Sequence, residues 1–125
     1  MLKTFTFVRM KPGIERETFY ERWCAHTRDF DLRDHPETSL NRLILFETPP
    51  PGAPADCVGV AENHWPDRAA VEEAIAWYQT PPGIEHNRDL EEFMDIAQSP
   101  TFIVESEVEV STEHGVAWKT GPADG

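Results

Sequence analysis

A chain of 125 residues, 27% charged and 39% hydrophobic, has the size and composition of one folded domain. No apolar run approaches the roughly 20 residues that a membrane-spanning helix needs, so we expect no membrane segment. The net charge of −12 would repel phosphate groups, which argues against nucleic acid and anionic lipid as partners. The N-terminus alternates polar and apolar residues, unlike a secretory signal, and we therefore expect a cytoplasmic protein.

The first half of the chain has the pattern of a strand, a helix and two further strands. Residues 3–9 alternate with period two, which predicts a strand that ends at the Pro-Gly pair. From residue 15 the apolar spacing changes to 3.6 and predicts a helix to about residue 28 or 30, with a loop over 31–38. Residues 40–48 and 56–65 predict two strands separated by a proline-rich loop.

The second half predicts a helix over 66–79 that ends at TPPG, and a shorter helix within 87–97. Residues 101–110 alternate most clearly and predict the last strand. Residues 111–125 are polar and contain glycine, so we expect a loose C-terminal tail after a domain formed by residues 1–110.

The resulting order, β-α-β-β-α-(α)-β, predicts a ferredoxin-like α+β fold. In this fold right-handed connections place the helices on one face of a four-stranded antiparallel sheet. The other face carries part of the hydrophobic alternation of the strands and should also be buried, most simply against a second copy of the chain. We therefore expect a homodimer.

One stripe of the first predicted helix combines aromatic side chains with an imidazole. Phe19, Trp23, His26 and Phe30 share a face at helical spacing. Histidine is the side chain best suited to proton transfer near neutral pH. Spacing alone leaves two alternatives open: His26 packs in the core with one nitrogen bonded to a backbone carbonyl, or it acts chemically in a pocket.

Other candidate residues have weaker patterns. Glu62 and His64 lie two apart on a strand and share a face, which suits a carboxylate that orients an imidazole, inside a cleft or at the dimer seam. Spacing supplies no third ligand, so we expect no metal site. Tyr78 is either a core residue or a hydrogen-bond donor. The aromatic residues that could line an apolar ligand site are Trp23, Trp65, Trp77, Phe5 and Phe7.

The chain resembles the EthD family of the dimeric α+β barrel superfamily over roughly residues 1–110. The matching segments are KPGIERETFYERW with AHT, RLILFET, VAENHW, RDLEEF and VESEVEV, in this order. The first helix of that family carries a Trp followed three residues later by a His, which Trp23 and His26 match. The resemblance implies two sheets that face each other in a dimer, with a pocket in each subunit between helices and sheet.

Relatives in this superfamily include methylmuconolactone isomerases, with an active-site histidine at the position matching His26, and cofactor-independent polyketide cyclases. The cyclases carry a His-Pro-x-His turn after the second helix, of which only His86 has a counterpart here. His64 is a feature of this chain rather than of the family. The resemblance thus implies proton transfer by His26, with His64 or His86 as a second polar group and Tyr78 as a hydrogen-bond donor.

From these patterns we expect a cofactor-independent acid/base enzyme, an isomerase, cyclase or lyase. Its substrate would be a small aromatic, lactone or polyketide-like carbonyl compound. The sequence contains no phosphate loop and no dinucleotide fingerprint, so we expect no cofactor. Two alternatives remain open: a non-catalytic ligand-binding or accessory protein for a degradative oxygenase, and a haem-binding protein.

Overall fold

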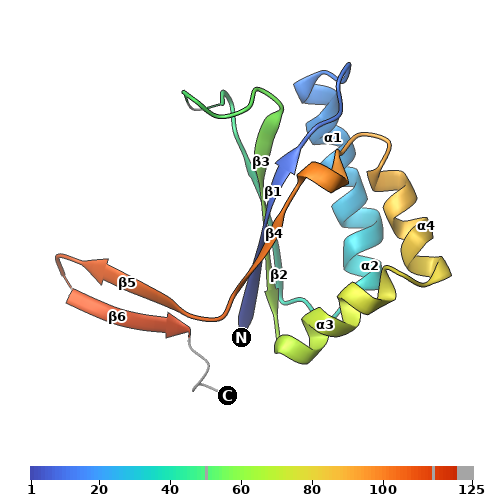
Figure 1. The fold of residues 1–125 in the computed structure, drawn as a ribbon. Coiled ribbons are helices and arrows are strands. Elements are labelled where there is room, and N and C mark those ends of the chain that lie inside the picture. The colour runs from blue at the N-terminus through green and yellow to red at the C-terminus, as the bar shows by residue number, and fades with distance from the viewer. Residues whose placement is uncertain (50, 114, 121–125) are drawn as a thin grey trace.

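The computed structural model describes residues 1–49, 51–113 and 115–120, and its centre is a four-stranded antiparallel sheet of order β2-β3-β1-β4. Its strands are β1 (Leu2–Arg9), β2 (Leu40–Leu45), β3 (Cys57–Trp65) and β4 (Thr101–Val104). The main helices are α1 (Arg16–His26), α3 (Arg68–Trp77) and α4 (Pro81–Leu90). All three lie on one side of the sheet (Figure 1), which confirms the predicted ferredoxin-like α+β fold.

The first helical segment is longer than its sequence pattern predicted. α1 continues into a π-helical turn, Thr27–Asp31, and then into α2, Leu32–Asp34. The amide of Leu32 donates to the carbonyl of Thr27, the i to i−5 bond that defines a π turn. Residues 32–34 are therefore helical rather than part of the expected loop, because the backbone bonding does not stop at the end of the apolar stripe.

The TPPG segment, residues 80–83, ends one helix and begins the next. α3 stops at Trp77 and α4 starts at Pro81, where a missing amide costs nothing because first-turn amides have no partner within the helix. A Cβ on Gly83 would collide with the carbonyl oxygen of Trp77, so this tight connection requires glycine. α4 thus begins earlier than the predicted segment over 87–97 and ends at Leu90, before Phe93.

The segment after residue 104 differs most from the prediction. β4 ends at Val104, and β5 (Glu107–Ser111) pairs with β6 (Gly115–Thr120) in a separate two-stranded sheet. The expected loose tail is therefore wrong for residues 115–120, because the alternation of 107–111 finds its partner there; residues 114 and 121–125 lie outside the described part. This two-stranded arm projects on the side of the sheet away from the helices (Figure 1).

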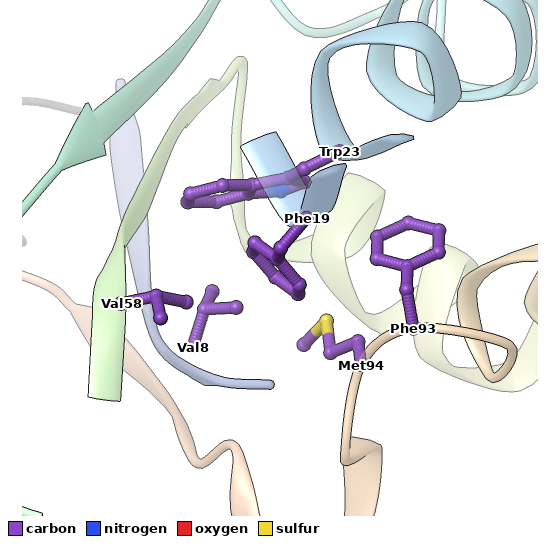
Figure 2. Packing of buried hydrophobic residues seen from close by; sticks show 6 residues of the cluster. All are labelled: Val8, Phe19, Trp23, Val58, Phe93 and Met94. Atoms are coloured by element: carbon purple, nitrogen blue, oxygen red, sulfur yellow. The ribbon is translucent and has the colours of Figure 1, made fainter. Parts of the chain in front are cut away.

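The main core lies between α1 and the strands. Its buried members are Val8, Phe19, Trp23, Val58, Phe93 and Met94. Figure 2 shows Phe19 between the valines of the strands and Phe93, and the rings of Phe19 and Phe93 meet edge to face with centroids 5.3 Å apart. Trp23 comes so close to Gly59 that a Cβ there would lie 2.9 Å from its ring. This packing turns the stripe of α1 that includes His26 toward the sheet.

The two faces of the sheet have different neighbours. Alternation turns Thr4 and Ala61 toward the helices, whereas their chain neighbours Phe5 and Glu62 point to the opposite, open face. The open face and the arm keep large apolar side chains exposed, such as Phe102 at 55%. Within the described part of the chain, no helix has the length and apolar content needed to cross a bilayer.

Candidate active site between the helices and the sheet

A cavity of about 350 Å³ lies between the helices and the sheet face that they cover. Strands β1, β3 and β4 and helices α1, α3 and α4 contribute to its walls. The wall is mostly apolar, and its titratable members are His26, Asp31 and Tyr78. A second hollow of similar volume lies on the surface beside Cys24 and Leu40, away from the buried histidines. A mostly apolar cavity with a few converging polar groups is typical of a small-molecule site.

His26 ends α1 at the wall of this cavity, only 2% exposed, and both of its ring nitrogens have side-chain partners. Nδ1 lies 2.9 Å from Oδ2 of Asp89, and Nε2 lies 3.2 Å from Nε2 of His86. The ring stacks on Phe30 with centroids 5.1 Å apart. The imidazole is therefore buried, but its nitrogens meet acidic and basic side chains rather than a backbone carbonyl.

His86, also 2% exposed, connects His26 to two aspartates from the extension of the first helix. Its Nδ1 lies 2.7 Å from Oδ2 of Asp34, and its Nε2 lies 3.0 Å from Oδ1 of Asp31. The same Oδ1 atom lies 3.6 Å from Nε2 of His26. We name these three residues, together with His26 and Asp89, the histidine–aspartate cluster.

Hydrogen-bonding rules limit where protons can lie in the histidine–aspartate cluster. A carboxylate only accepts, so Nδ1 of each histidine donates to its aspartate, Asp89 or Asp34. The Nε2 atoms of His26 and His86 and Oδ1 of Asp31 would then face one another as acceptors, 3.0 to 3.6 Å apart. Acceptors this close repel, so the geometry requires at least one proton or cation between them.

The pKa shifts of His26 and two of the aspartates agree with a proton at this point. Burial disfavours the imidazolium of His26, but the hydrogen bonds and charges of Asp31 and Asp89 outweigh it and raise the pKa above 6.5. Burial alone would raise the pKa of Asp31, but hydrogen bonds from both histidines hold it at about 2. The hydrogen bond from Arg33, with a second one from His86, lowers the pKa of Asp34 to about 2, although partial burial acts in the opposite direction. Asp31 and Asp34 are thus ionised, and the surroundings of His26 favour its protonated form.

Tyr78 places a second polar group at the cavity, and its partner is a residue that the sequence did not single out. Its hydroxyl lies 2.6 Å from Nε2 of His35, which is buried between the rings of Trp65 and Trp77. Burial lowers the pKa of His35 and raises that of Tyr78, so both are neutral near pH 7.

The residues selected from sequence are divided between the two sides of the sheet. Trp23, His26, Trp65 and Tyr78 line the cavity, and His86 joins it through His26. Trp77 does not line it but packs against the rings of His35 and His86.

The other selected residues, Phe5, Phe7, Glu62 and His64, lie on the open face of the sheet. Glu62 and His64 do pair, as their spacing predicted, with Oε2 and Nε2 2.5 Å apart, and Arg42 joins them. Their pairing therefore takes place on the opposite side of the sheet from His26, and they do not lie inside the cleft.

The sequence patterns did not select four residues that lie near the cavity, namely Asp31, Asp34, His35 and Asp89. The first three fall in the segment expected as a loop, and only a helix extended through a π turn brings Asp31 and Asp34 to His86. Asp89 carried a usable signal, because it follows His86 by three residues and such residues share one face of a helix.

Fold and site together define a ferredoxin-like α+β protein with a polar cluster at the end of an apolar cavity. No family profile matches the sequence, and no curated protein matches it. Solved structures do resemble it. The protein At3g17210 of Arabidopsis thaliana is similar with a TM-score of 0.61 and 14% identity, over 89% of this chain and 99% of that one.

Two further structures show the same architecture. A Bacteroides fragilis protein described as dimeric, ferredoxin-like and of unknown function has a TM-score of 0.53 and 9% identity, over 82% and 93% of the two chains. A Nitrosomonas europaea protein described as an antibiotic biosynthesis monooxygenase has a TM-score of 0.51 and 14% identity, over 83% and 94%. At these identities the likeness establishes the fold alone.

Proposed function

We propose that this protein is an enzyme that holds a small, mostly apolar carbonyl compound in the cavity and moves a proton with His26. The observation that carries the proposal is the position of His26: it lines the cavity while Asp89 holds one nitrogen and His86 the other. The reaction would be that of an isomerase, cyclase or lyase. The relative described as a monooxygenase supports an enzymatic role for a protein of this fold.

The histidine pair is suited to both halves of a proton transfer. The proton between the two Nε2 atoms can pass to the substrate, and the pair can then take one back, so His26 acts as acid and as base. A positioned acid or base of this kind accelerates a reaction by about 10²–10⁴-fold. Because His86 makes this contact and His64 lies on the other face of the sheet, the geometry favours His86 as the second group.

Tyr78 would stabilise negative charge on the substrate oxygen. A neutral histidine has one N–H, and if His35 carries it on Nε2, this group donates to the oxygen of Tyr78. The hydroxyl proton of Tyr78 is then free to point into the cavity, where Tyr78 forms part of the wall. A donor fixed in this way stabilises an enolate oxygen without reorganising during the reaction.

We also propose that the protein is a homodimer of the EthD type, joined through the open face of the sheet. Phe7 is 42% exposed on this face, and Trp118 is 72% exposed on the arm beside it. Large exposed apolar side chains on one side of a sheet mark an interaction surface. The dimeric relative supports a second copy as the partner. Phe5, Glu62 and His64 would then lie at or near the seam.

The decisive experiment needs no knowledge of the natural substrate. Proton abstraction next to a carbonyl breaks a C–H bond and, in heavy water, returns deuterium to the same carbon. We would follow this exchange by NMR for a panel of lactones, aryl ketones and β-diketones. We expect His26→Ala to slow the exchange at least about 100-fold, the lower limit for loss of an acid–base group.

The matched control is His64→Ala, which removes a half-buried histidine from the opposite face of the sheet. It should leave the exchange rate unchanged. A folded His26→Ala protein that exchanges as fast as the unmodified chain would contradict the proposed function.

A further inference from the structure

Three atoms of the histidine–aspartate cluster converge as metal ligands do. The Nε2 atoms of His26 and His86 are 3.2 Å apart, and Oδ1 of Asp31 lies 3.6 Å from the first and 3.0 Å from the second. Tetrahedral zinc binds nitrogen and oxygen at about 2.0–2.2 Å, which places adjacent ligand atoms about 3.3–3.6 Å apart. The triangle formed by the three atoms therefore has close to the dimensions of one face of such a tetrahedron.

The outer nitrogens of both histidines are also held as in metal sites. Nδ1 of His26 donates to Asp89, and Nδ1 of His86 donates to Asp34. Metal-binding histidines usually donate their second N–H to a carboxylate, which fixes the tautomer and turns the other lone pair to the metal. Here both histidines make this bond, so both Nε2 atoms keep a lone pair, and both lie within 3.6 Å of Oδ1 of Asp31.

The charges around this point can accommodate a divalent cation. Arg33 pairs with Asp34 and Arg22 is shared between Asp89 and the closer Glu92, whereas the ion pairs of Asp31 are with the two histidines. A divalent cation would bring two charges to Asp31 and leave both imidazoles neutral. Two imidazoles and one carboxylate are a ligand set typical of divalent first-row metals.

We propose that His26, Asp31 and His86 bind a divalent transition-metal cation such as Zn²⁺, and that this cation and the shared proton exclude each other. The second half of the inference rests on the proposed function. A cation on Nε2 of His26 occupies the lone pair that would accept the proton, so metal binding stops proton transfer. His26 and Asp31 also line the cavity, so the cation would act from within the active site.

Binding can be measured without any enzymatic reaction. Protein stripped with a chelator would be titrated with Co²⁺, whose visible absorption reports four-coordinate nitrogen and oxygen ligands, and with Zn²⁺ in competition with a coloured chelator. We expect one cation per chain. Asp31→Asn and His86→Gln should abolish the cobalt spectrum, and Asp34→Asn and Asp89→Asn should weaken affinity about 10–100-fold, as for other carboxylates that orient metal-binding histidines.

The matched control is Glu62→Gln, which removes the carboxylate of the Glu62–His64 pair on the open face of the sheet. It should leave the cobalt spectrum and the affinity unchanged. No stoichiometric uptake by the unmodified chain, or uptake that persists in Asp31→Asn and His86→Gln, would overturn the metal site.

The exchange assay separates this inference from the proposed function. In the unmodified chain, Zn²⁺ should reduce exchange in step with its occupancy, and exchange that continues at full occupancy would overturn mutual exclusion. If exchange depends on His26 but no metal binds, the inference fails and the function stands. If metal binds to the three residues but metal-free protein exchanges equally well without His26, the proposed function fails and the metal site stands.

Discussion

His26 and His86 are separated by 60 residues in the sequence, yet their Nε2 atoms lie 3.2 Å apart in the folded chain. α1 supplies the first histidine and α4 the second, and each is anchored through Nδ1 by an aspartate. Two imidazoles in this arrangement need a proton or a cation between them. The proposed chemistry of the cavity follows from this contact.

Replacing Tyr78 by Phe should slow deuterium exchange at the substrate carbon about 10²-fold or more. This is the usual effect of losing a hydrogen-bond donor to a developing oxyanion. The ring remains, so the fold and the cavity should be retained. The exchange assay and a thermal melt check both expectations.

Tyr20→Phe is the matched control for this substitution. The hydroxyl of Tyr20 also bonds inside the protein, but to the backbone carbonyls of Val58 and Phe46. Its loss should lower the free energy of unfolding by about 1 kcal/mol and leave exchange unchanged. Equal exchange rates in the two tyrosine variants would contradict the role of Tyr78.

Glu62 should stabilise the folded state near neutral pH, and this contribution should be lost in acid. Its hydrogen bond with His64, together with the charge of Arg42, lowers its pKa below 4.5. A carboxyl with a lowered pKa stabilises the fold above its unfolded pKa, and this stabilisation is lost as the pH falls through the folded pKa. Urea unfolding should therefore show Glu62→Gln to be less stable than the unmodified chain at pH 7, with the difference shrinking below about pH 5. A difference that is independent of pH would contradict the ion-pair explanation.

The open face of the sheet should control assembly. Phe102→Glu places a charge among apolar side chains that a second copy would cover, and should convert a dimer into a monomer in sedimentation equilibrium. Ile84→Glu is the control, because Ile84 is 50% exposed but lies on α4, on the other side of the sheet. The proposal of an open-face dimer would be wrong if Phe102→Glu left the mass unchanged, or if Ile84→Glu reduced it equally.

Gly59→Ala should destabilise the core. The new Cβ would collide with the carbonyl oxygen of Ile44 and lie 2.9 Å from the ring of Trp23. Overpacking of this kind costs about 1–3 kcal/mol. In a double-mutant cycle with Trp23→Phe, the smaller ring should relieve part of this cost, whereas strictly additive losses would show that Trp23 does not oppose the new methyl group.

Local patterns predicted the order of elements because period-two and period-3.6 alternation is visible in one chain. The same patterns placed His26 on the buried stripe of its helix. They predicted that Glu62 and His64 share a face, but the side that the helices cover depends on tertiary packing. The break between β4 and β5 and the pairing of residues 115–120 were likewise invisible, because an alternating run does not show where its partner changes.

The sequence patterns could not predict the aspartates of the site, for a different reason. Asp31 and Asp34 follow the last apolar residue of the stripe, where the helical pattern ends, and only the π turn carries them to His86. His86 itself lies on a helix that starts at two prolines. A partner 60 residues away cannot be identified from spacing along one chain.

Proton transfer by the paired histidines is tested most directly by a double-mutant cycle with His26→Gln and His86→Gln, measured on the rate of deuterium exchange. Residues that act as one unit show strongly non-additive losses, so the double variant should be no slower than His26→Gln alone. The thermal melts should show that all three variants remain folded. If the two losses multiply, or if His26→Gln exchanges as fast as the unmodified chain, the paired histidines are not the proton-transfer group.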